Sequence, residues 1–446
     1  MHGFGYYSTC WSTSKYYDAK TVAATRATLG DERMPPTPAI PLLRRDVIDR
    51  RALLRLVAQA GATVLGGVSP GFAQQAQTFK IGWIRPTTGR LASSFAPLYF
   101  GGLIAIDEIN AAGGILGHQI ERAEEDDEAS PAKEPGIVRK LREQDIGGIA
   151  GPTGSSQSLA SIAATTSAKI VQSTYAAAAE AGDGRKYPYH YQIMFNTDQQ
   201  ADVCVEYMAR VLGLKKIGVL QENTAFGEQA AAATKTVLQK TFGLAPVSEQ
   251  VYPIAAPDLS AYVANLQKAG ADGVIGWIAN VPNAAMIFNA MKTLKWFPPV
   301  AGHSGLMLPA LFDLVPAEAV KNVFATYYRN FTWTDTEQPG ARQVAFANKL
   351  AQYPEARGFE VNVAAAPYYD FLYCLKAAIE AEKSFEPEAI KRGLDNLRNY
   401  KGLLGDISFT PENHSGVGVR DVVLVSVASG QDARAMGCLR ARAPGQ

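Results

Sequence analysis

From Phe79 onward the sequence alternates between short apolar runs and longer stretches with helical spacing of apolar residues. The first run, Phe79–Ile84, is typical of a buried strand, and the helical stretch after it ends at a pair of glycines. Such repeated units predict an α/β fold with parallel sheets covered by helices. Further strands are expected at residues 118–124, 146–150, 169–173, 216–221, 247–252, 273–278, 405–409 and 422–427, and helices at 132–144, 200–212, 228–241, 259–269, 283–294, 361–382 and 387–397.

The alternation occurs in two successive blocks. Residues 187–197, with an extended stretch at 189–193, interrupt it, and a second interruption is predicted at 320–328. We expect both to be crossings between two lobes, one made of residues 79–197 and 328–404 and the other of 198–327 and 405–440. Such crossings form a hinge, and open sheets bind ligands in the crevice at the carboxyl ends of their strands.

The stretch Asp145–Ser158 joins a predicted buried strand to a helix through a turn that contains Gly151 and Gly154. Such a junction places backbone N–H groups and serine hydroxyls at the positive end of a helix, where a carboxylate or another small anion binds well. Ser155 and Ser156 are therefore candidate ligand-binding residues. The alternative is that one of them only caps the helix.

Composition and charge exclude several classes of function. The chain of 446 residues carries 43 lysines and arginines against 42 acids, so no charge excess points to nucleic acid or to a basic partner. Its five histidines and four cysteines are scattered without the spacing of metal ligands. We expect no metal and no cofactor.

Residues 1–73 differ from the rest of the chain. Arg50-Arg51 precedes a weakly apolar stretch, Leu56–Val68, and a small-residue exit that ends at Ala73. This pattern predicts a twin-arginine export signal cleaved after Ala73, and hence a periplasmic protein; Met34 is an alternative translation start. The stretch is too short and too polar for a membrane anchor, so no stable membrane insertion is expected after processing.

Seven short stretches share a pattern with one protein family: Thr88-Gly89, Ile106–Gly117, Gly151–Ser155, Ala225–Gly227, Asp258–Ser260, Tyr369-Asp370 and Gly405–Phe409. In this order they resemble the leucine/isoleucine/valine-binding family of periplasmic substrate-binding proteins, which serve ABC importers. The resemblance covers about residues 79–430. It implies the type I fold, with two doubly wound parallel-sheet lobes joined by a three-strand hinge, a small-molecule ligand, and ABC permease subunits as partners.

The resemblance also implies a site. The family holds its ligand's carboxylate with the serine after the Gly-Pro turn, which is Ser155 here. The next loop of the family supplies a backbone carbonyl and a threonine hydroxyl, and Ala176 and Ala177 stand at those positions, so the hydroxyl is missing. The aromatic residue of the second lobe is kept as Phe226. An aromatic residue of the first loop is replaced by Ser94.

Amino-acid binders of the family pair the ligand's ammonium group with a glutamate, at the position that Asn283 is expected to occupy here. Burying an ammonium group without a counter-charge is costly. We therefore hypothesise that branched-chain amino acids bind weakly and that a carboxylate without an ammonium group, or an uncharged amide, binds better. Trp277 and His303 are expected to line a pocket for an aromatic or alicyclic acid; the alternative for Trp277 is a place in the core.

No enzyme signature is complete. Gly302–Leu306 ends in leucine where a nucleophile elbow needs glycine, and the loop after the first strand lacks the glycines that bind a dinucleotide. The acid pairs Asp107/Glu108 and Asp126/Asp127 are expected on the solvated surface. We predict a solute-binding receptor rather than an enzyme, with a ligand sensor that acts through a signalling partner as the alternative.

Overall fold

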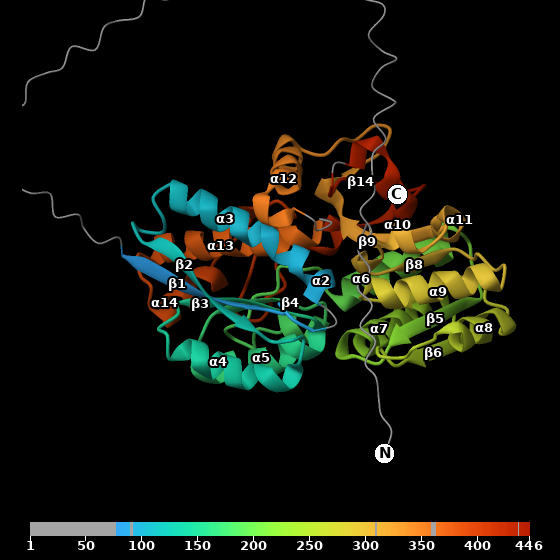
Figure 1. Cartoon of the computed structure of the whole chain (residues 1–446), viewed down its shortest axis with the longest axis horizontal. Coiled ribbons are helices and arrows are strands. Elements are labelled where there is room, and N and C mark those ends of the chain that lie inside the picture. Colours follow the sequence, from blue (N-terminus) through green and yellow to red (C-terminus); the bar gives the residue numbers. More distant parts are fainter. Residues whose placement is uncertain (1–76, 90–91, 308–309, 358–362, 436) are drawn as a thin grey trace, which may run out of the picture. The chain divides into compact units, whose positions relative to one another are not determined.

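The computed structural model describes residues 77–89, 92–307, 310–357, 363–435 and 437–446. The predicted export signal and the segment before it lie outside the described residues. Figure 1 shows two sheets side by side, each covered by helices, which agrees with the predicted α/β fold of two lobes. We call the part around the first sheet the first lobe and the part around the second sheet the second lobe. No helix in the described ranges is long and apolar enough to span a membrane.

The first sheet has four parallel strands in the order β2-β1-β3-β4. Helices α3 and α13 pack together on one face of this sheet, and α4 and α5 pack together on the other (Figure 1). The elements are β1 (Thr78–Arg85), β2 (Gln119–Asp126), β3 (Gly148–Thr153), β4 (Gln172–Tyr175), α3 (Phe100–Ala111), α4 (Glu134–Arg142), α5 (Ser155–Ala168) and α13 (Ala366–Glu382). The predicted β-α units of this half are confirmed.

The second sheet has six strands in the order β13-β9-β8-β7-β5-β6, all parallel except β13. Helix α6 packs on α7, and α8 packs on α9. The elements are β5 (Ile217–Glu222), β6 (Ser248–Tyr252), β7 (Gly273–Trp277), β8 (Val300–Gly302), β9 (Val323–Tyr328), β13 (Val422–Ser426), α6 (Thr197–Val205, continued by π-helical Glu206–Val211), α7 (Ala225–Phe242), α8 (Ser260–Lys268) and α9 (Val281–Thr293).

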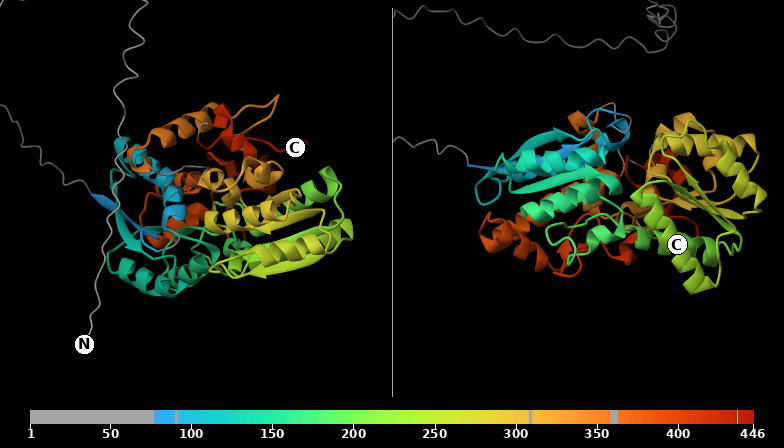
Figure 2. Two further views of the ribbon diagram at one scale, coloured as in Figure 1. Left: turned by 45° about the vertical axis from the view of Figure 1, so that its right-hand side comes forward. Right: turned by 90° about the horizontal axis from the view of Figure 1, so that it is seen from below.

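Smaller elements complete the described chain. Figure 2 gives two further views of their arrangement. They are α2 (Ala92–Phe95), α10 (Ala310–Leu314), α11 (Ala317–Val320), α12 (Ala341–Gln352), α14 (Pro387–Asp395), β10 (Thr332–Trp333), β11 (Tyr400–Lys401), β12 (Asp406–Ile407) and β14 (Arg440–Ala441), with short 3-10 turns between them.

Three strand predictions need correction. Residues 323–328, expected in a crossing, form the buried strand β9 inside the second sheet, and the strand β8 beside it was not predicted. Residues 406–407 pair with β11 in a two-stranded ribbon and not with either large sheet. A short apolar run has the same appearance in a crossing and in a central strand, so the sequence pattern alone could not separate them.

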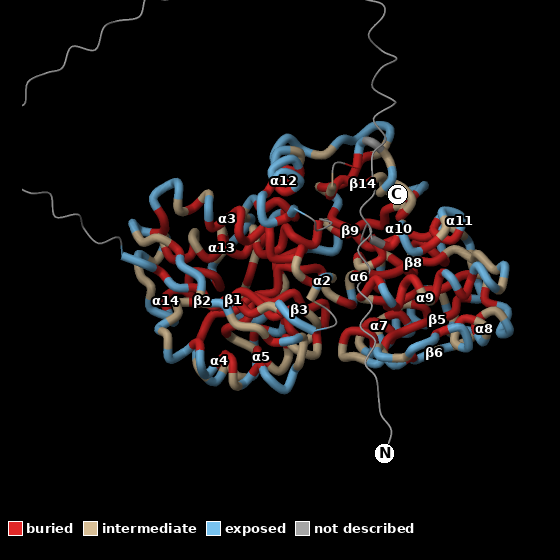
Figure 3. Tube along the Cα trace, viewed as in Figure 1, coloured by how far each residue is buried: buried red, intermediate tan, exposed pale blue. Residues whose placement is uncertain are grey.

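Crossing segments from distant parts of the chain lie side by side between the lobes. Gln192 donates its backbone N–H to the carbonyl of His414 (2.9 Å), and Gly416 donates to the carbonyl of Gln192 (2.8 Å). Residues 189–193 therefore form isolated bridges rather than a regular strand. Figure 3 shows that buried residues run through both sheets, and Tyr189, Tyr191 and Ile193 belong to the same core cluster as residues of both lobes, so packing is continuous where the lobes join.

Candidate ligand-binding site

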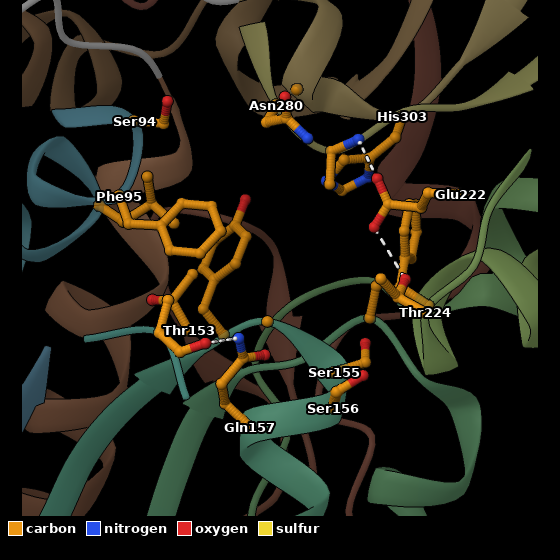
Figure 4. A pocket seen from close by; sticks show the side chains of 18 of the residues that line it. Ser94, Phe95, Thr153, Ser155, Ser156, Gln157, Glu222, Thr224, Asn280 and His303 are labelled. Carbon is orange, nitrogen blue, oxygen red and sulfur yellow. Dashed lines mark hydrogen bonds between the residues drawn. The ribbon is translucent and has the colours of Figure 1, made fainter. Parts of the chain in front are cut away.

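A cavity of about 290 Å³ lies where the carboxyl ends of strands from both sheets meet. Thr153 and Tyr175 end β3 and β4 on the first-lobe side, and Glu222 ends β5 on the second-lobe side. Asn280 and His303 follow β7 and β8 and complete the second wall. Figure 4 shows polar side chains around one space, with Thr153, Ser155, Ser156 and Gln157 on one side and Glu222, Thr224, Asn280 and His303 on the other.

Three helices begin at the cavity: α5 from the first lobe, and α7 and α9 from the second. The second-lobe helices are capped by side chains, because Oγ1 of Thr224 accepts from Gly227 N (3.3 Å) and Oδ1 of Asn280 accepts from Asn283 N (3.0 Å). Helix α5 has Gly154 as its N-cap and no side-chain cap. Helix starts carry partial positive charge, so an uncapped start favours a ligand atom that accepts hydrogen bonds.

Glycine fixes the turn that leads into α5. Gly151 has φ +101°, and a Cβ atom there would lie 1.9 Å from the carbonyl oxygen of Ile84. Gly154 has φ +96°, and the first helical hydrogen bond runs from Ser158 N to its carbonyl (2.9 Å). The N–H groups of residues 155–157 have no hydrogen-bond acceptor among the described residues, and all three residues line the cavity.

Ser155 is buried and does not cap α5. Its Oγ accepts the backbone N–H of Ala178 at 3.0 Å, which ties the loop after β4 to the helix start. A hydroxyl has one proton to donate in addition to its lone pairs. Since the lone pair takes the Ala178 N–H, that proton can be donated into the cavity.

Ser156 connects the two lobes. Its Oγ accepts the backbone N–H of Ala225 (3.3 Å), the first residue of α7. A second bond between the lobes runs from Nε2 of Gln229 on α7 to Oε1 of Glu180 (2.9 Å). Ser156 therefore lines the cavity and also holds its two walls together.

Glu222 places a carboxylate in the second wall. Its Oε1 accepts from Oγ1 of Thr224 (2.8 Å) and its Oε2 from the backbone N–H of Ala279 (3.1 Å), so two donors orient it. The side chain is buried and lies between the starts of α7 and α9. The Thr224 hydroxyl and the Ala279 N–H together fix the position of both carboxyl oxygens.

His303 presents a lone pair to the cavity. Its Nδ1 lies 2.7 Å from Oε1 of Gln200, which also accepts from Oγ1 of Thr326 (3.0 Å). An amide oxygen can only accept, so Nδ1 carries the proton. Burial lowers the pKa of His303 to about 3, and the ring is therefore neutral with Nε2 as an acceptor.

The rest of the lining is mainly apolar. The Phe226 ring packs against the His303 ring with 4.8 Å between their centroids. Trp277 makes an edge contact with the Phe226 ring, with 6.1 Å between centroids. The first-lobe side adds Phe95, Leu98, Tyr175, Met194 and Ala364. An apolar lining with a few convergent polar groups is typical of small-molecule sites.

The predicted site residues divide into two groups. Those that line the cavity are Ser94, Ser155, Ser156, Ala177, Phe226 and His303. Those that do not are Ala176, Trp277 and Asn283. The backbone carbonyl of Ala176 accepts from Gln192, Trp277 donates to Thr234, and Asn283 donates to the carbonyl of Ile254, so packing inside the protein accounts for all three.

The sequence analysis missed Gln157, Glu222, Thr224 and Asn280. Each of Glu222, Thr224 and Asn280 stands within a few residues of the carboxyl end of a second-sheet strand, which was the available signal. The prediction from Asn283 that the second wall lacks an acid was wrong, because Glu222, at the end of β5, supplies a carboxyl group there.

The acidic loop after β2 is not a solvated turn. Asp127 is fully buried beside Glu134, whereas Asp126 holds the loop after β1 through Thr87 N (2.9 Å) and Oγ1 of Thr88 (2.7 Å). Burial, reinforced by the neighbouring Asp127, raises the pKa of Glu134 to about 9, so at neutral pH this carboxyl keeps its proton. Burial also raises the pKa of Asp127.

The family model described as periplasmic binding protein matches residues 78–432. The chain belongs to this family. Members are solute-binding receptors rather than enzymes and act outside the cytoplasm. Within the described residues no group of three or more histidine, cysteine or acidic side chains is placed to hold a metal ion.

A Leu/Ile/Val-binding protein homologue of Brucella abortus is 25% identical over 350 residues, which span 73% of this chain and 84% of the relative. Two solved structures share the fold. The branched-chain amino acid transporter substrate-binding protein of Streptococcus pneumoniae, in complex with isoleucine, has a TM-score of 0.68, 22% identity, and coverage of 78% of this chain and 96% of its own. An ABC transporter solute-binding protein of Rhodopseudomonas palustris, in complex with 3,4-dihydroxybenzoic acid, has a TM-score of 0.65, 20% identity, and coverage of 78% and 93%.

Proposed function

We propose that this protein is an extracytoplasmic receptor that captures a small carboxylate- or amide-bearing solute between its lobes and delivers it to an ABC importer of the branched-chain amino acid type. The observation that carries the proposal is the cavity at which α5 begins without a cap, facing the carboxylate and imidazole of the second wall. A ligand that contacts both walls stabilises the closed arrangement of the lobes.

The relatives support the solute class and the partner. One solved neighbour holds isoleucine and another holds 3,4-dihydroxybenzoic acid, and both of these ligands carry a carboxylate. The start of α5 offers the backbone donors and the Ser155 hydroxyl that such a group needs. Delivery to a permease requires a soluble protein outside the cytoplasm, and the twin-arginine pattern before Ala73 would provide the export.

The test is a thermal-shift screen of the exported, processed protein with aliphatic, aromatic and amide solutes, followed by calorimetry on each compound that raises the melting temperature. We expect at least one compound to bind with a dissociation constant in the micromolar range or below and to bind more weakly to the Ser155→Ala protein. A folded protein that binds none of them, or a bound compound whose affinity is the same in both proteins, would contradict the proposal.

Sequencing the exported protein from its N-terminus tests cleavage after Ala73.

A further inference from the structure

One polar atom in the second wall has no partner. Nδ2 of Asn280 is buried and lacks a hydrogen-bond acceptor among the described residues, although Oδ1 of the same side chain caps α9. Buried donors are almost always satisfied in folded proteins, and leaving one unsatisfied costs about 1–3 kcal/mol. Asn280 lines the cavity, and Figure 4 shows its amide group next to the His303 ring, on the same side as Glu222.

The neighbours of this donor are acceptors. Nε2 of His303 is a lone-pair acceptor because Nδ1 donates to Oε1 of Gln200, and Oγ of Ser304 lies 3.5 Å from Nε2. The Glu222 carboxylate accepts only. The second wall therefore offers one N–H donor beside two acceptors, and a matching ligand group needs one acceptor beside N–H donors.

We propose that this wall is a carboxamide subsite, in which Nδ2 of Asn280 donates to the amide oxygen of the ligand while Nε2 of His303 and the Glu222 carboxylate accept its N–H protons. A carboxylate at this end has no proton to donate to either acceptor. An ammonium group satisfies the acceptors but leaves Asn280 without a partner. Of these three groups, the amide alone supplies both kinds of hydrogen bond.

The inference rests on the proposed function and narrows it. The uncapped start of α5 binds the carboxylate or carbonyl end of the solute, and the subsite selects an amide at the opposite end. Sites built from buried polar groups reject analogues that leave those groups unpaired, by factors that can reach about 10⁴. The preference for an amide over the matched acid or amine is the quantity to measure.

Two matched series of probes separate the three end groups. The first is 4-carbamoylbenzoate, terephthalate and 4-(aminomethyl)benzoate, and the second is succinamate, succinate and 4-aminobutanoate. Each series keeps one carboxylate and changes only the opposite end. Calorimetry on the processed protein should show the amide binding at least about tenfold more tightly than its acid and its amine in at least one series, which corresponds to one unsatisfied buried group.

The Asn280→Asp variant tests the residue itself. Aspartate keeps the oxygen that caps α9 and removes the Nδ2 donor. We expect the amide to lose at least tenfold in affinity and the amine to gain. The Asn289→Asp variant is the control, because it makes the same chemical change at an exposed position of the same helix. Melting curves confirm that both variants fold, and if Asn280→Asp does not, His303→Phe replaces it and should weaken the amide more than the acid.

The outcomes separate the two proposals. Tighter binding of the acid or the amine than of the amide in both series overturns the carboxamide subsite, and so does a failure of all six probes to bind. If another solute from the thermal-shift screen still binds and depends on Ser155, the receptor function stands without the subsite. An amide preference that is the same in the Asn280→Asp protein would also overturn the assignment to this wall.

Discussion

The two walls of the cavity are built from the same kinds of element, but they differ in how their helix starts are capped. In each wall, parallel strands end and helices begin, so both carry the partial positive charge of helix starts. The second lobe satisfies its helix starts with its own side chains, Thr224 and Asn280, and adds Glu222. The first lobe leaves α5 without a cap. The first wall therefore donates to a ligand, and the second wall mainly accepts from it.

The buried acids near the two walls, Glu222 and Glu134, also differ in their surroundings. Glu222 faces the cavity and is oriented by two donors, whereas Glu134 lies behind the first wall and is protonated at neutral pH. Both are buried, but Glu134 faces another acid, Asp127, whereas Glu222 faces two hydrogen-bond donors. A ligand with different ends consequently has one favourable orientation, because only the second wall presents a carboxylate.

The largest change in binding is expected from Glu222→Gln. Hydrogen bonds to a charged group contribute about 1.5–3 kcal/mol, so a ligand with an N–H-bearing end should bind about 10- to 100-fold more weakly. Glutamine keeps the size of the side chain and an oxygen that can accept from Thr224 or Ala279. Calorimetry with 4-carbamoylbenzoate measures the change, and Glu249→Gln, at the exposed strand β6, is the control. Equal affinities in the wild type and Glu222→Gln would mean that the second wall does not act through its charge.

A stability change without a binding change is expected from Glu134→Gln. The pKa of Glu134 is about 9 in the folded protein and about 4.5 in the unfolded chain, so the folded state holds a proton that the unfolded state has lost. The free energy of unfolding therefore decreases as pH rises from about 4.5 to about 9. Glutamine removes this dependence and should stabilise the protein at pH 8, relative to wild type, by about 1–3 kcal/mol.

Urea unfolding at pH 5 and pH 8 measures this effect, with the exposed Glu143→Gln as control. Ligand affinity at pH 7 should not change, because Glu134 does not line the cavity. If the difference in free energy of unfolding between the wild type and Glu134→Gln were the same at pH 5 and at pH 8, Glu134 would be ionised in the folded protein. The contrast between the two acids would then disappear.

The repeated strand–helix pattern of the fold could be predicted from the sequence, but the polar contacts of the site could not. Periodicity and the glycine turn located the first wall and Ser155, because strand and helix boundaries are local properties. Glu222 and Asn280 were missed because their role depends on which strands are neighbours in the second sheet. Asp127 appeared solvated for the same reason, since its burial depends on packing against Glu134, seven positions away in a different element.

A smaller effect is expected from Ser155→Ala in the first wall. One neutral hydrogen bond contributes about 0.5–1.5 kcal/mol, so affinity for a carboxylate-bearing probe should fall about two- to tenfold. The melting temperature should fall too, because the backbone N–H of Ala178 loses its acceptor. The control is Ser167→Ala, an exposed position on the same helix. A loss of affinity as large as that of Glu222→Gln would reverse the order of the two walls.

The smallest effect is expected from Ser156→Ala, which touches the bond between the walls rather than either wall alone. The hydroxyl accepts from Ala225 N across the two walls, and we expect this bond to help hold the lobes closed over a bound ligand. Its loss should therefore raise the dissociation rate about two- to fivefold and leave the association rate unchanged, since a neutral bond of this kind contributes about 0.5–1 kcal/mol. Stopped-flow fluorescence separates the two rates, and Gln229→Ala, which removes the bond to Glu180, should act in the same direction. If Ser156→Ala slowed association instead, the hydroxyl would act on the incoming solute, and Ser156 would belong to the donating wall together with Ser155.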